Sequence, residues 1–392
     1  MFKVKTLIKF ALEIPPTIWT AGTTYPMALS RALKRTYGSD VALYFVQRDV
    51  LSRSDKDVAE LEGQVIRINS SREWTPKFVV EYAMSTLLSH DLVGSRVLEE
   101  NKIDVLFGHL LRNRYRMPTL SWIPDFQHVR LPQMFSAEER RQRDRIFLKT
   151  TRISDRIIVM SESVKGDFKR FAPEYSHKVR VLPAVSFPPE TVYEREPRSV
   201  LALYHLPEKF VYFPGQFWKH KNHDLVFKAL AFLKEGGSEV FLVCDGTPED
   251  YRHRRHFADL LTSVSTLGLR SQVALICSPN QEHVFSLMRQ AVCVLNASLF
   301  EGFGLTINEA MCLGKRVLLS DIDAHREQNP PKATYFDPNN CKDLAANLYH
   351  VWNETAPGPD LQLEKQARQM LSSRSRVSAD SLMSLLHEVT NH

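Results

Sequence analysis

The sequence has few cysteines, and none of them belongs to a Cys-x-x-Cys pair. The five cysteines are Cys244, Cys277, Cys293, Cys312 and Cys341, an odd number confined to the second half of the chain. A zinc site built from paired cysteines, or a disulfide framework, requires a different pattern. We therefore predict reduced thiols that pack as small apolar residues in the cores of a cytosolic protein.

The sequence also lacks long apolar runs. No stretch reaches the roughly 18–20 apolar residues that a membrane-spanning helix requires. The opening MFKVKTLIKFAL is basic and apolar like a secretory signal, but its apolar part is short and a small-residue cleavage site is missing. We interpret it as a first sheet strand, in a chain that has neither short repeats nor low-complexity tracts.

The length of the chain and the distribution of its charge indicate the number of domains and the kind of partner. A length of 392 residues favours two domains, because single cores rarely grow beyond about 250–300 residues. Residues 1–190 carry 30 Lys and Arg against 22 Asp and Glu, whereas residues 191–392 carry 21 against 23. The basic first half suits an acidic acceptor, an anionic membrane surface or nucleic acid, and a solvated basic surface is the alternative.

Short apolar runs alternate with amphipathic stretches in two successive series. The first series of runs is KTLIKFAL, DVALYFV, GQVIRIN, IDVLFGHL, TLSWIP, DRIIVMS and KVRVLPA. The second is KFVYFPG, EVFLVCDG, QVALICS, AVCVLNAS, RVLLSD and ATYFDP. Continuous apolar strands that alternate with helical patterns, such as those at 25–35 and 76–99, predict parallel sheets covered by helices on both faces.

We therefore expect an α/β protein of two doubly wound, Rossmann-like domains that face each other across a cleft. The domains would span residues 1–190 and 200–360, joined by a linker at 191–199 that is rich in charge and follows two prolines. Residues 361–392 have a helical pattern, and this tail could pack on its own domain or cross back to the first. Ligands of such sheets bind beyond the carboxyl ends of the strands, beside helix N-termini.

The most informative segment follows the strand AVCVLNAS. The turn Glu301-Gly302-Phe303-Gly304-Leu305 precedes a helix-like run over 306–313, which Gly314 ends. Glycines allow a backbone to approach a ligand closely, and the free N–H groups of a first helical turn suit a pyrophosphate. Of the two carboxylates Glu301 and Glu309, one could meet a sugar or stabilise positive charge at the reacting carbon, and the other could accept hydrogen bonds from ribose hydroxyls. Glycine turns before helices are also common without such a role.

The longer segment SLFEGFGLTINEAMCLGKRVLLSDIDAHREQ resembles the retaining glycosyltransferases with the GT-B fold, the glycosyl transferases group 1. This family includes bacterial mannosyl- and glucosyltransferases and sucrose synthase. Its hallmark is an acidic residue, seven further residues and then Glu, and Glu301 and Glu309 match that spacing. The resemblance implies that Glu301 contacts the donor sugar, that Glu309 binds the ribose, and that the backbone of 302–305 lies near the diphosphate.

A second matching region is FPGQFWKHKNHDLVFKALAFLK. The family usually has a Gly-Arg pair here and a Lys five residues beyond the Arg, and these cations neutralise the donor diphosphate without a metal. Gly215 and Lys221 stand at two of these positions, but Gln216 replaces the Arg. Lys219, His220 or a basic group from the first half could supply the missing charge; alternatively, the lysines simply begin a solvated helix. The stretch CDGTPED fits the family's strand-end turn beside the nucleotide base.

The first half matches the family less well. The family often has His-Asp after a strand, with the His near the transferred sugar, whereas TLSWIPDFQHVRLPQMFS has Asp125 after a proline and His128 three residues later. His128 could take the role, Asp125 could act alone, or His128 could be an ordinary loop histidine. His109 follows another strand and is expected at the same cleft. Gly22 stands where the family commonly has a Gly-Gly loop.

Three further patterns have less specific interpretations. The clusters LRNRYRMP (111–118) and ERRQRDR (139–145) are basic, and the first, with its tyrosine, is compatible with nucleic acid or anionic lipid, or with a solvated face. In SDRIIVMSESVKGDF, Ser161 or Ser163 is expected to cap a helix. The stretch Asp321-Ile322-Asp323 is assigned to structure or the donor pocket, so no metal is implied.

The resemblance implies a metal-independent, retaining hexosyltransferase without a cofactor. It would transfer a sugar such as mannose from a nucleotide-diphosphate sugar to a glycan or lipid-linked acceptor, in the synthesis of a cell-envelope polysaccharide such as lipopolysaccharide. We expect a cytoplasmic enzyme without a nucleic-acid partner, and leave open a peripheral contact with the anionic inner face of the membrane. The alternatives are a nucleotide-sugar 2-epimerase, whose family lacks the Glu-Gly-Phe-Gly segment, and a non-catalytic GT-B binding protein.

Overall fold

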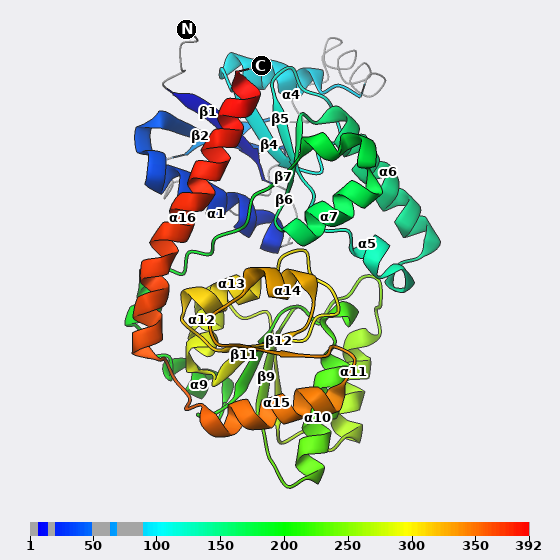
Figure 1. Cartoon of the computed structure of the whole chain (residues 1–392), viewed down its shortest axis with the longest axis vertical. Helices are drawn as coiled ribbons and strands as arrows, with labels where there is room; N and C mark the ends of the chain where they lie inside the picture. The colour runs from blue at the N-terminus through cyan, green and yellow to red at the C-terminus, as the bar shows by residue number, and fades with distance from the viewer. Residues whose placement is uncertain (1–6, 15–19, 49–62, 69–88, 392) are drawn as a thin grey trace. The chain divides into compact units, whose positions relative to one another are not determined.

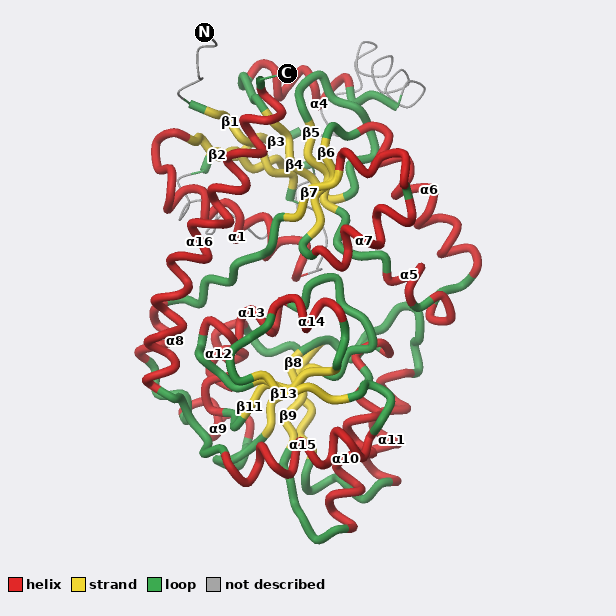
Figure 2. Tube along the Cα trace, viewed as in Figure 1, coloured by secondary structure: helices red, strands yellow, loops and turns green. Residues whose placement is uncertain are grey.

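The computed structural model contains two compact units, which we call unit 1 and unit 2 (Figure 1). Unit 1 comprises residues 1–126, 137–185 and 373–392, and unit 2 comprises residues 127–136 and 186–372. The residues that the structure describes are 7–14, 20–48, 63–68 and 89–391. Each unit is built around one parallel β-sheet (Figure 2).

Unit 1 has a seven-stranded sheet in the order β3-β2-β1-β4-β5-β6-β7. Its strands are β1 (Ile8–Glu13), β2 (Val41–Gln47), β3 (Gln64–Arg67), β4 (Val105–His109), β5 (Thr119–Trp122), β6 (Arg156–Val159) and β7 (Val179–Val181). Its helical segments are α1 (Thr20–Tyr37), η1 (Gly38–Asp40), α4 (Leu92–Glu100), α6 (Ala137–Ile153), α7 (Glu162–Phe171) and η3 (Pro173–Lys178).

Unit 2 has a six-stranded sheet in the order β10-β9-β8-β11-β12-β13. Its strands are β8 (Val211–Pro214), β9 (Leu242–Gly246), β10 (Val273–Cys277), β11 (Cys293–Asn296), β12 (Val317–Ser320) and β13 (Ala333–Phe336). Its helical segments are α5 (Gln127–Arg130), η2 (Pro132–Met134), α8 (Glu190–Glu194), α9 (Ser199–Tyr204), η4 (Lys219–Lys221), α10 (His223–Glu235), α11 (His256–Thr266), α12 (Gln281–Gln290), α13 (Leu305–Cys312), α14 (Asp323–Gln328) and α15 (Cys341–Glu354).

The expected fold class, two parallel α/β sheets, is confirmed. Each apolar run named above coincides with one of the strands to within a few residues, and all strand pairs that the structure describes are parallel. In both sheets the strand order reverses beside the first strand of the unit, between β1 and β4 in unit 1 and between β8 and β11 in unit 2. Such reversals are the switch points at which doubly wound sheets bind ligands.

Apolar side chains explain how the helices of unit 2 cover its sheet. In α10 the buried residues Leu225, Val226, Ala229, Leu230 and Leu233 recur at helical spacing, so one face of the helix packs on the sheet. They share a core cluster with apolar residues of β8, β9 and β11, while a second cluster on α12 and α13 covers the other face. Burying side chains of this size contributes about 1.5–3 kcal/mol each.

Local sequence sets several helix boundaries. Ser161 caps α7, because its hydroxyl accepts a hydrogen bond from the amide of Val164 at 3.1 Å, which confirms one of the two expected caps. Part of the helix expected at 76–99 lies outside the described residues, and the rest begins at Leu92, after the N-cap Asp91. Gly22 lies in the first turn of α1, where we had expected a loop.

The cysteine prediction needs one correction. Cys244, Cys293 and Cys312 are buried and Cys341 is half-buried, whereas Cys277 is exposed and is therefore not a core residue. Cys277 is the last residue of β10, an edge strand of the sheet in unit 2. Side chains at the end of an edge strand have fewer neighbours than those inside the sheet, which leaves this thiol open to solvent.

Two segments belong to a unit other than the one their position in the sequence suggests. Residues 127–136 stand between β5 and α6 of unit 1 but group with unit 2. Helix α16 (Leu361–Thr390, red in Figure 1) begins in unit 2 and ends in unit 1, where Glu388 pairs with Arg156 at 2.9 Å and Arg180 at 2.5 Å. The boundaries expected at 190, 199 and 360 stay predictions. Among the helices in the described ranges, none combines the length and apolarity of a membrane span.

Gly314, which ends α13, is required for two separate reasons. Its φ of +61° lies in the left-handed region that favours glycine, and a Cβ atom there would approach the backbone of Leu363 and Glu364 to within 2.5–2.7 Å. The same stretch of α16 is fixed by the buried ion pair of Glu364 with Arg289, at 2.6 Å. The backbone at Leu363 therefore has little freedom to move away.

We predict that Gly314→Ala destabilises the protein much more than Gly237→Ala does. Gly237 also has a positive φ, +80°, but a Cβ atom there would have no neighbour within 4 Å. Gly237→Ala should thus cost only the left-handed strain, about 1–2 kcal/mol, whereas Gly314→Ala adds overpacking for a total of about 2–5 kcal/mol. Urea unfolding measures both, and equal losses would contradict the steric argument.

Candidate active site

The predicted donor-site residues lie on loops that follow β8 and β11, the two strands that flank the switch point of unit 2. The loop after β8 contains Gly215, Gln216 and Lys219 and leads through η4 into α10. The loop after β11 contains Glu301 and the glycine turn and leads into α13. Because parallel strands end at the same edge of a sheet, the fold brings these two distant stretches of sequence together.

An ion pair joins the two loops. The ammonium group of Lys221 lies 2.6 Å from Oε1 of Glu301, and both side chains are largely buried, with 16% and 13% of their surface exposed. A backbone hydrogen bond of 2.8 Å, from the amide of Leu299 to the carbonyl of His220, runs beside it. These contacts hold an acidic and a basic group side by side at the carboxyl edge of the sheet.

Glu301 is ionised in this setting. Burial by itself would raise its pKa, but the charge of Lys221 and the hydrogen bond from that side chain more than offset burial and lower the pKa to about 2. Nearby His220 and His325 are buried, and burial lowers the pKa of each well below its usual value. Both imidazoles are therefore neutral near pH 7, and Lys221 is the main source of positive charge next to Glu301.

A chain of hydrogen bonds fixes the orientation of the Glu301 carboxylate. The hydroxyl of Ser298 donates to Oε1 of Glu301 at 2.7 Å, and the hydroxyl of Ser320 donates to the carbonyl of Ser298 at 2.6 Å. Nδ1 of His325 lies 2.8 Å from the carbonyl of Ser320. The loop after β12 thus supports the loop after β11, and the carboxylate has little freedom to turn away.

The glycine turn before α13 has the geometry of an anion site. Gly304 is the N-cap of α13, with a φ of +88°, and no side chain caps the helix. The side-chain amide of Gln328 donates to the carbonyls of Phe303 and Gly304, the latter at 3.1 Å, which holds the turn in place. The amide of Ile307 donates to the carbonyl of Gly304 at 3.1 Å, whereas the amides of Leu305 and Thr306 have no partner among the described residues and can meet a negatively charged ligand, which the helix dipole also favours.

Glu309 lies on α13 close to a second carboxyl group, Asp245, at the end of β9. Burial raises the pKa of Asp245 to about 6, and burial together with the nearby Asp245 raises the pKa of Glu309 to about 8. Without a ligand, Glu309 is thus predominantly protonated at neutral pH. The two acidic residues of the signature consequently differ in charge, since Glu301 is ionised and Glu309 is neutral.

The loop after β8 packs tightly against the end of β9. The amide of Gly215 donates to Oδ1 of Asp245 at 3.2 Å, and a Cβ atom on Gly246 would lie only 2.4 Å from the carbonyl of Gly215. Gln216, which stands where the family usually has arginine, is half-buried. Its side-chain amide makes no hydrogen bond to the described part of the chain. Lys219 is exposed on η4.

One functional candidate was not predicted from the sequence. Arg252 is almost fully buried; it donates to the side-chain oxygen of Gln127 at 2.8 Å, and its guanidinium lies over the rings of Phe135 and Trp218, 4.7 and 5.1 Å from their centroids. It therefore fastens residues 127–136 to the loop after β9. In the sequence, Arg252 belongs to the basic run YRHRR, which has the pattern of a solvated loop. The sequence therefore gives little indication that Arg252 is buried.

Residues 127–136, which we call the strap, are held at a second point as well. Arg130 pairs with Asp323 at the start of α14, at 2.9 Å. Because Arg252 follows β9 and Asp323 follows β12, the strap contacts loops on both sides of the β8–β11 switch point. It is therefore attached to the carboxyl edge of the sheet in unit 2, the edge that carries Glu301.

The residues predicted in the first half of the chain come from different elements of the two units. His128 belongs to the strap in unit 2, where it is buried with its ring 6.3 Å from that of Phe135, while Asp125 is half-buried in unit 1. His109, at the end of β4, packs its ring on Trp122 at 5.4 Å, and burial with nearby arginines lowers its pKa to about 4. Gly22 lies in α1. Within the described residues, no three His, Cys, Asp or Glu side chains gather as a metal site.

Comparison with known proteins agrees with this geometry. Residues 204–370, which contain the ion pair and the glycine turn, match the family described as Glycosyl transferases group 1. The matched segment belongs to that family. A solved Anabaena protein, HepE, in complex with UDP-glucose superimposes with a TM-score of 0.68 at 14% identity, over 97% of this chain and all of that one. WaaG, a glycosyltransferase involved in lipopolysaccharide biosynthesis, superimposes with a TM-score of 0.59 at 17% identity, over 98% and 100%.

These solved structures establish the fold class, GT-B, and the sequence relatives are more restricted. A GDP-mannose:cellobiosyl-diphosphopolyprenol alpha-mannosyltransferase of Xanthomonas campestris is 42% identical over 65 residues. The match covers 17% of this chain and 17% of that relative. A short stretch of high identity therefore accompanies a similarity in fold that extends over nearly the whole chain.

The raised pKa of Glu309 leads to a pH-dependent prediction for Glu309→Gln in the ligand-free protein. The folded state binds the extra proton between the unfolded pKa, near 4.5, and the folded pKa, about 8. The stability that this group contributes is complete below pH 4.5 and is lost as the pH rises towards 8. Glutamine cannot ionise, so the Tm of Glu309→Gln relative to the native protein should rise between about pH 5 and pH 8.

A thermal unfolding series in which the exposed Glu235 is changed to Gln provides the control. Glu235→Gln makes the same chemical change at an exposed position at the end of α10, and it is the reference for the Tm change of Glu309→Gln at each pH. A Tm difference for Glu309→Gln that is constant or falls with pH would refute the assignment of a protonated Glu309.

Proposed function

We propose that the protein is a retaining glycosyltransferase that transfers a hexosyl unit from a nucleotide-diphosphate sugar without a metal ion. The observation that carries the proposal is the Lys221–Glu301 pair, which lies beside the glycine turn of α13 at the switch point of unit 2. A donor diphosphate placed there would meet the ammonium group of Lys221 and the free amides that begin α13. The ribose would reach Glu309 further along the same helix.

In this reaction, the bond between the anomeric carbon and the diphosphate oxygen breaks, and the departing diphosphate gains negative charge. Lys221 and the amides of residues 302–305 stabilise that charge. The ionised Glu301 stabilises the positive character that develops on the sugar. The acceptor hydroxyl attacks from the face that the diphosphate leaves, and its proton passes to a departing phosphate oxygen, so the anomeric configuration is retained. Asp125 and His128 are the candidates for contacts with the sugar and acceptor.

The named relatives suggest which donors and acceptors to test first. The Xanthomonas relative uses GDP-mannose and a diphosphopolyprenol-linked acceptor by name, and the Anabaena structure holds UDP-glucose. A lipid-linked or glycan acceptor in cell-envelope polysaccharide synthesis is consistent with the basic charge of residues 1–190. We propose a cytoplasmic location, with peripheral contact to an anionic membrane surface.

The proposal is tested by incubating the full chain with GDP-mannose or UDP-glucose and a lipid-linked glycan acceptor. We expect transfer that persists in the presence of EDTA, and a product whose anomeric configuration by NMR matches that of the donor. An inverted product would refute the retaining mechanism. A chelator that abolishes activity would refute metal independence, and conversion of the donor without any acceptor would instead favour the epimerase.

Lys221→Met should lower kcat/KM for sugar transfer by about 100–1,000-fold, because it removes the main cation next to the leaving diphosphate. Methionine keeps most of the apolar length of the side chain, but Glu301 loses its partner. Thermal unfolding therefore accompanies the activity measurement, which is made at a temperature at which the variant is folded. Lys228→Met, an exposed substitution on α10, is the matched control and should leave kcat/KM unchanged. Nucleotide release measures both variants, and equal activities would remove Lys221 from the mechanism.

A further inference from the structure

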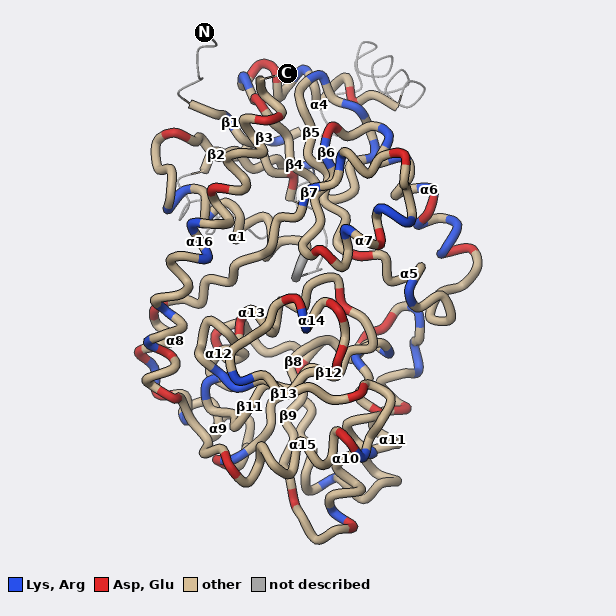
Figure 3. Tube along the Cα trace, viewed as in Figure 1, with Lys and Arg blue, Asp and Glu red and all other residues tan. Residues whose placement is uncertain are grey.

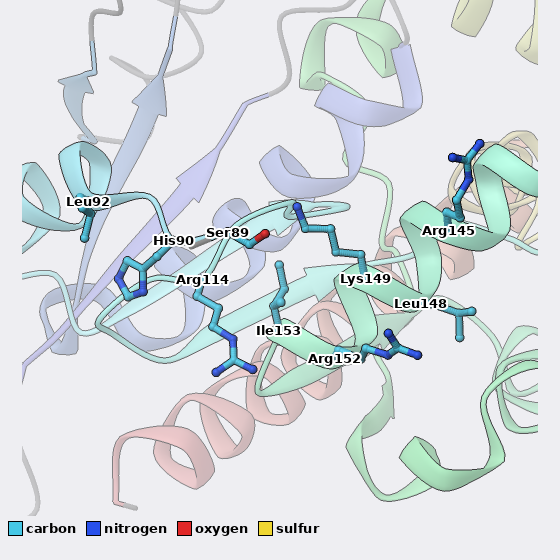
Figure 4. A pocket seen from close by; sticks show the side chains of 9 residues that line it. All are labelled: Ser89, His90, Leu92, Arg114, Arg145, Leu148, Lys149, Arg152 and Ile153. Carbon is cyan, nitrogen blue, oxygen red and sulfur yellow. The ribbon is translucent and has the colours of Figure 1, made fainter. Parts of the chain in front are cut away.

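A basic cavity in unit 1 has none of the proposed donor-site residues in its lining. It has a volume of about 720 Å³. One wall is formed by the loops around Ser89 and Arg114, and the other by the C-terminal half of α6 (Figure 4). The lining combines cationic, apolar and small polar groups: Arg114, Arg145, Lys149, Arg152, Leu92, Leu148, Ile153, Ser89 and His90.

The structure brings together two basic clusters that are separate in the sequence. Arg114 comes from the cluster at 111–118 and Arg145 from the cluster at 139–145, and both line the cavity. Lys149 and Arg152 follow Arg145 at spacings of four and three residues, so they share one face of α6. Figure 3 shows the run of basic residues along this helix, and in Figure 4 the Lys149 side chain extends towards Ser89 on the facing loop.

Hydrogen bonds hold both walls in place. The amide of Arg114 donates to the carbonyl of Ser89 at 2.8 Å, and the amide of Asp91 donates to the carbonyl of Arg114 at 2.9 Å. The guanidinium of Arg48 pairs with Asp91 at 2.7 Å, and the hydroxyl of Thr150 on α6 donates to the carbonyl of Leu111 at 2.9 Å. The cavity is thus preformed rather than a gap between loosely held segments.

Most of the cations of this cavity are not neutralised by the part of the chain that the structure describes. Within those residues, Arg114, Lys149 and Arg152 have no carboxylate partner, and Nε2 of His90 has no hydrogen-bond partner. Arg145 has a carboxylate oxygen of Glu138 at 3.3 Å. Like charges around one cavity repel one another, and an anion that binds there relieves this repulsion.

We propose that this cavity binds a phosphate group carried by an apolar chain, that is, a lipid phosphate. Guanidinium and ammonium groups suit phosphate oxygens, while Leu92, Leu148 and Ile153 offer apolar surface to the part of the lipid next to the phosphate. Nucleic acid fits less well, because Tyr115, the aromatic residue of the 111–118 cluster, bonds to Arg48 and does not line the cavity.

This inference goes beyond the donor site, and it can fail or hold independently of sugar transfer. A lipid phosphate held in unit 1 would keep the protein at a membrane surface or hold an acceptor by its lipid end. In both cases the cavity would recognise the same group, a phosphate next to an apolar chain. Binding is therefore measured without a nucleotide sugar and without turnover.

The test compares three forms of the full chain: the native protein, Lys149→Glu/Arg152→Glu, and Arg140→Glu. Arg140 is exposed on the same helix but does not line the cavity, and nine residues from Lys149 place it on the opposite side of α6. Titration calorimetry with monomeric dihexanoyl phosphatidic acid measures lipid-phosphate binding, and inorganic pyrophosphate provides the arm without an apolar chain. Vesicles of phosphatidylglycerol with phosphatidylcholine, against phosphatidylcholine alone, measure membrane attachment.

We expect the native protein and Arg140→Glu to bind the short-chain lipid alike, and the double variant to bind it at least about tenfold more weakly. Attachment to the anionic vesicles should weaken in the same variant only. Equal lipid binding by all three forms would overturn the proposal. Pyrophosphate that binds as tightly as the lipid, and is lost in the same double variant, would overturn the lipid assignment in favour of a free phosphate compound. Thermal unfolding of each variant confirms that it is folded.

Discussion

The Lys221–Glu301 ion pair is the interaction on which the proposed site depends. It joins the loops after β8 and β11, which are adjacent in the sheet but 80 residues apart in the sequence. It also sets the charge of Glu301, whose pKa would rise through burial without the ammonium group. A buried carboxylate without its partner would lower the stability of the fold. The same ion pair therefore stabilises the two loops and sets the charge of the proposed site.

The strap contacts the carboxyl edge of the sheet in unit 2, although in the sequence it stands between two segments of unit 1. Arg252 and Asp323 hold it from opposite sides of the switch point. His128, one candidate for the role of the family's histidine, therefore belongs to the same unit as Glu301. The sequence order suggested an acceptor-domain residue, but packing assigns it to the domain that carries the proposed donor site.

More of the fold than of the candidate site is predictable from the sequence. The strands of the described residues were predictable, because each coincides with a short apolar run, and the central ones, which are buried on both faces, are continuously apolar. The glycine turn at 302–304 was predictable from its spacing as well. The role of Arg252 was not, since its partners Gln127 and Phe135 lie more than 100 residues away. The protonation of Glu309 was also hidden, because it results from burial beside Asp245, which only the folded chain creates.

The protonation of Glu309 affects how much positive charge the proposed donor site needs, given that Gln216 stands where the family usually has arginine. In the proposed donor complex, the diphosphate would meet the ammonium group of Lys221, which is already paired with the ionised Glu301. An ionised Glu309 would add repulsion, whereas a protonated one adds none and can both donate and accept a hydrogen bond with the ribose hydroxyls. The loss of a cation at Gln216 is thus partly offset by the loss of an anion at Glu309. A pocket that combines few cations with a neutral carboxyl group can still favour an anionic donor, because the amides and dipole of α13 supply the remaining positive potential.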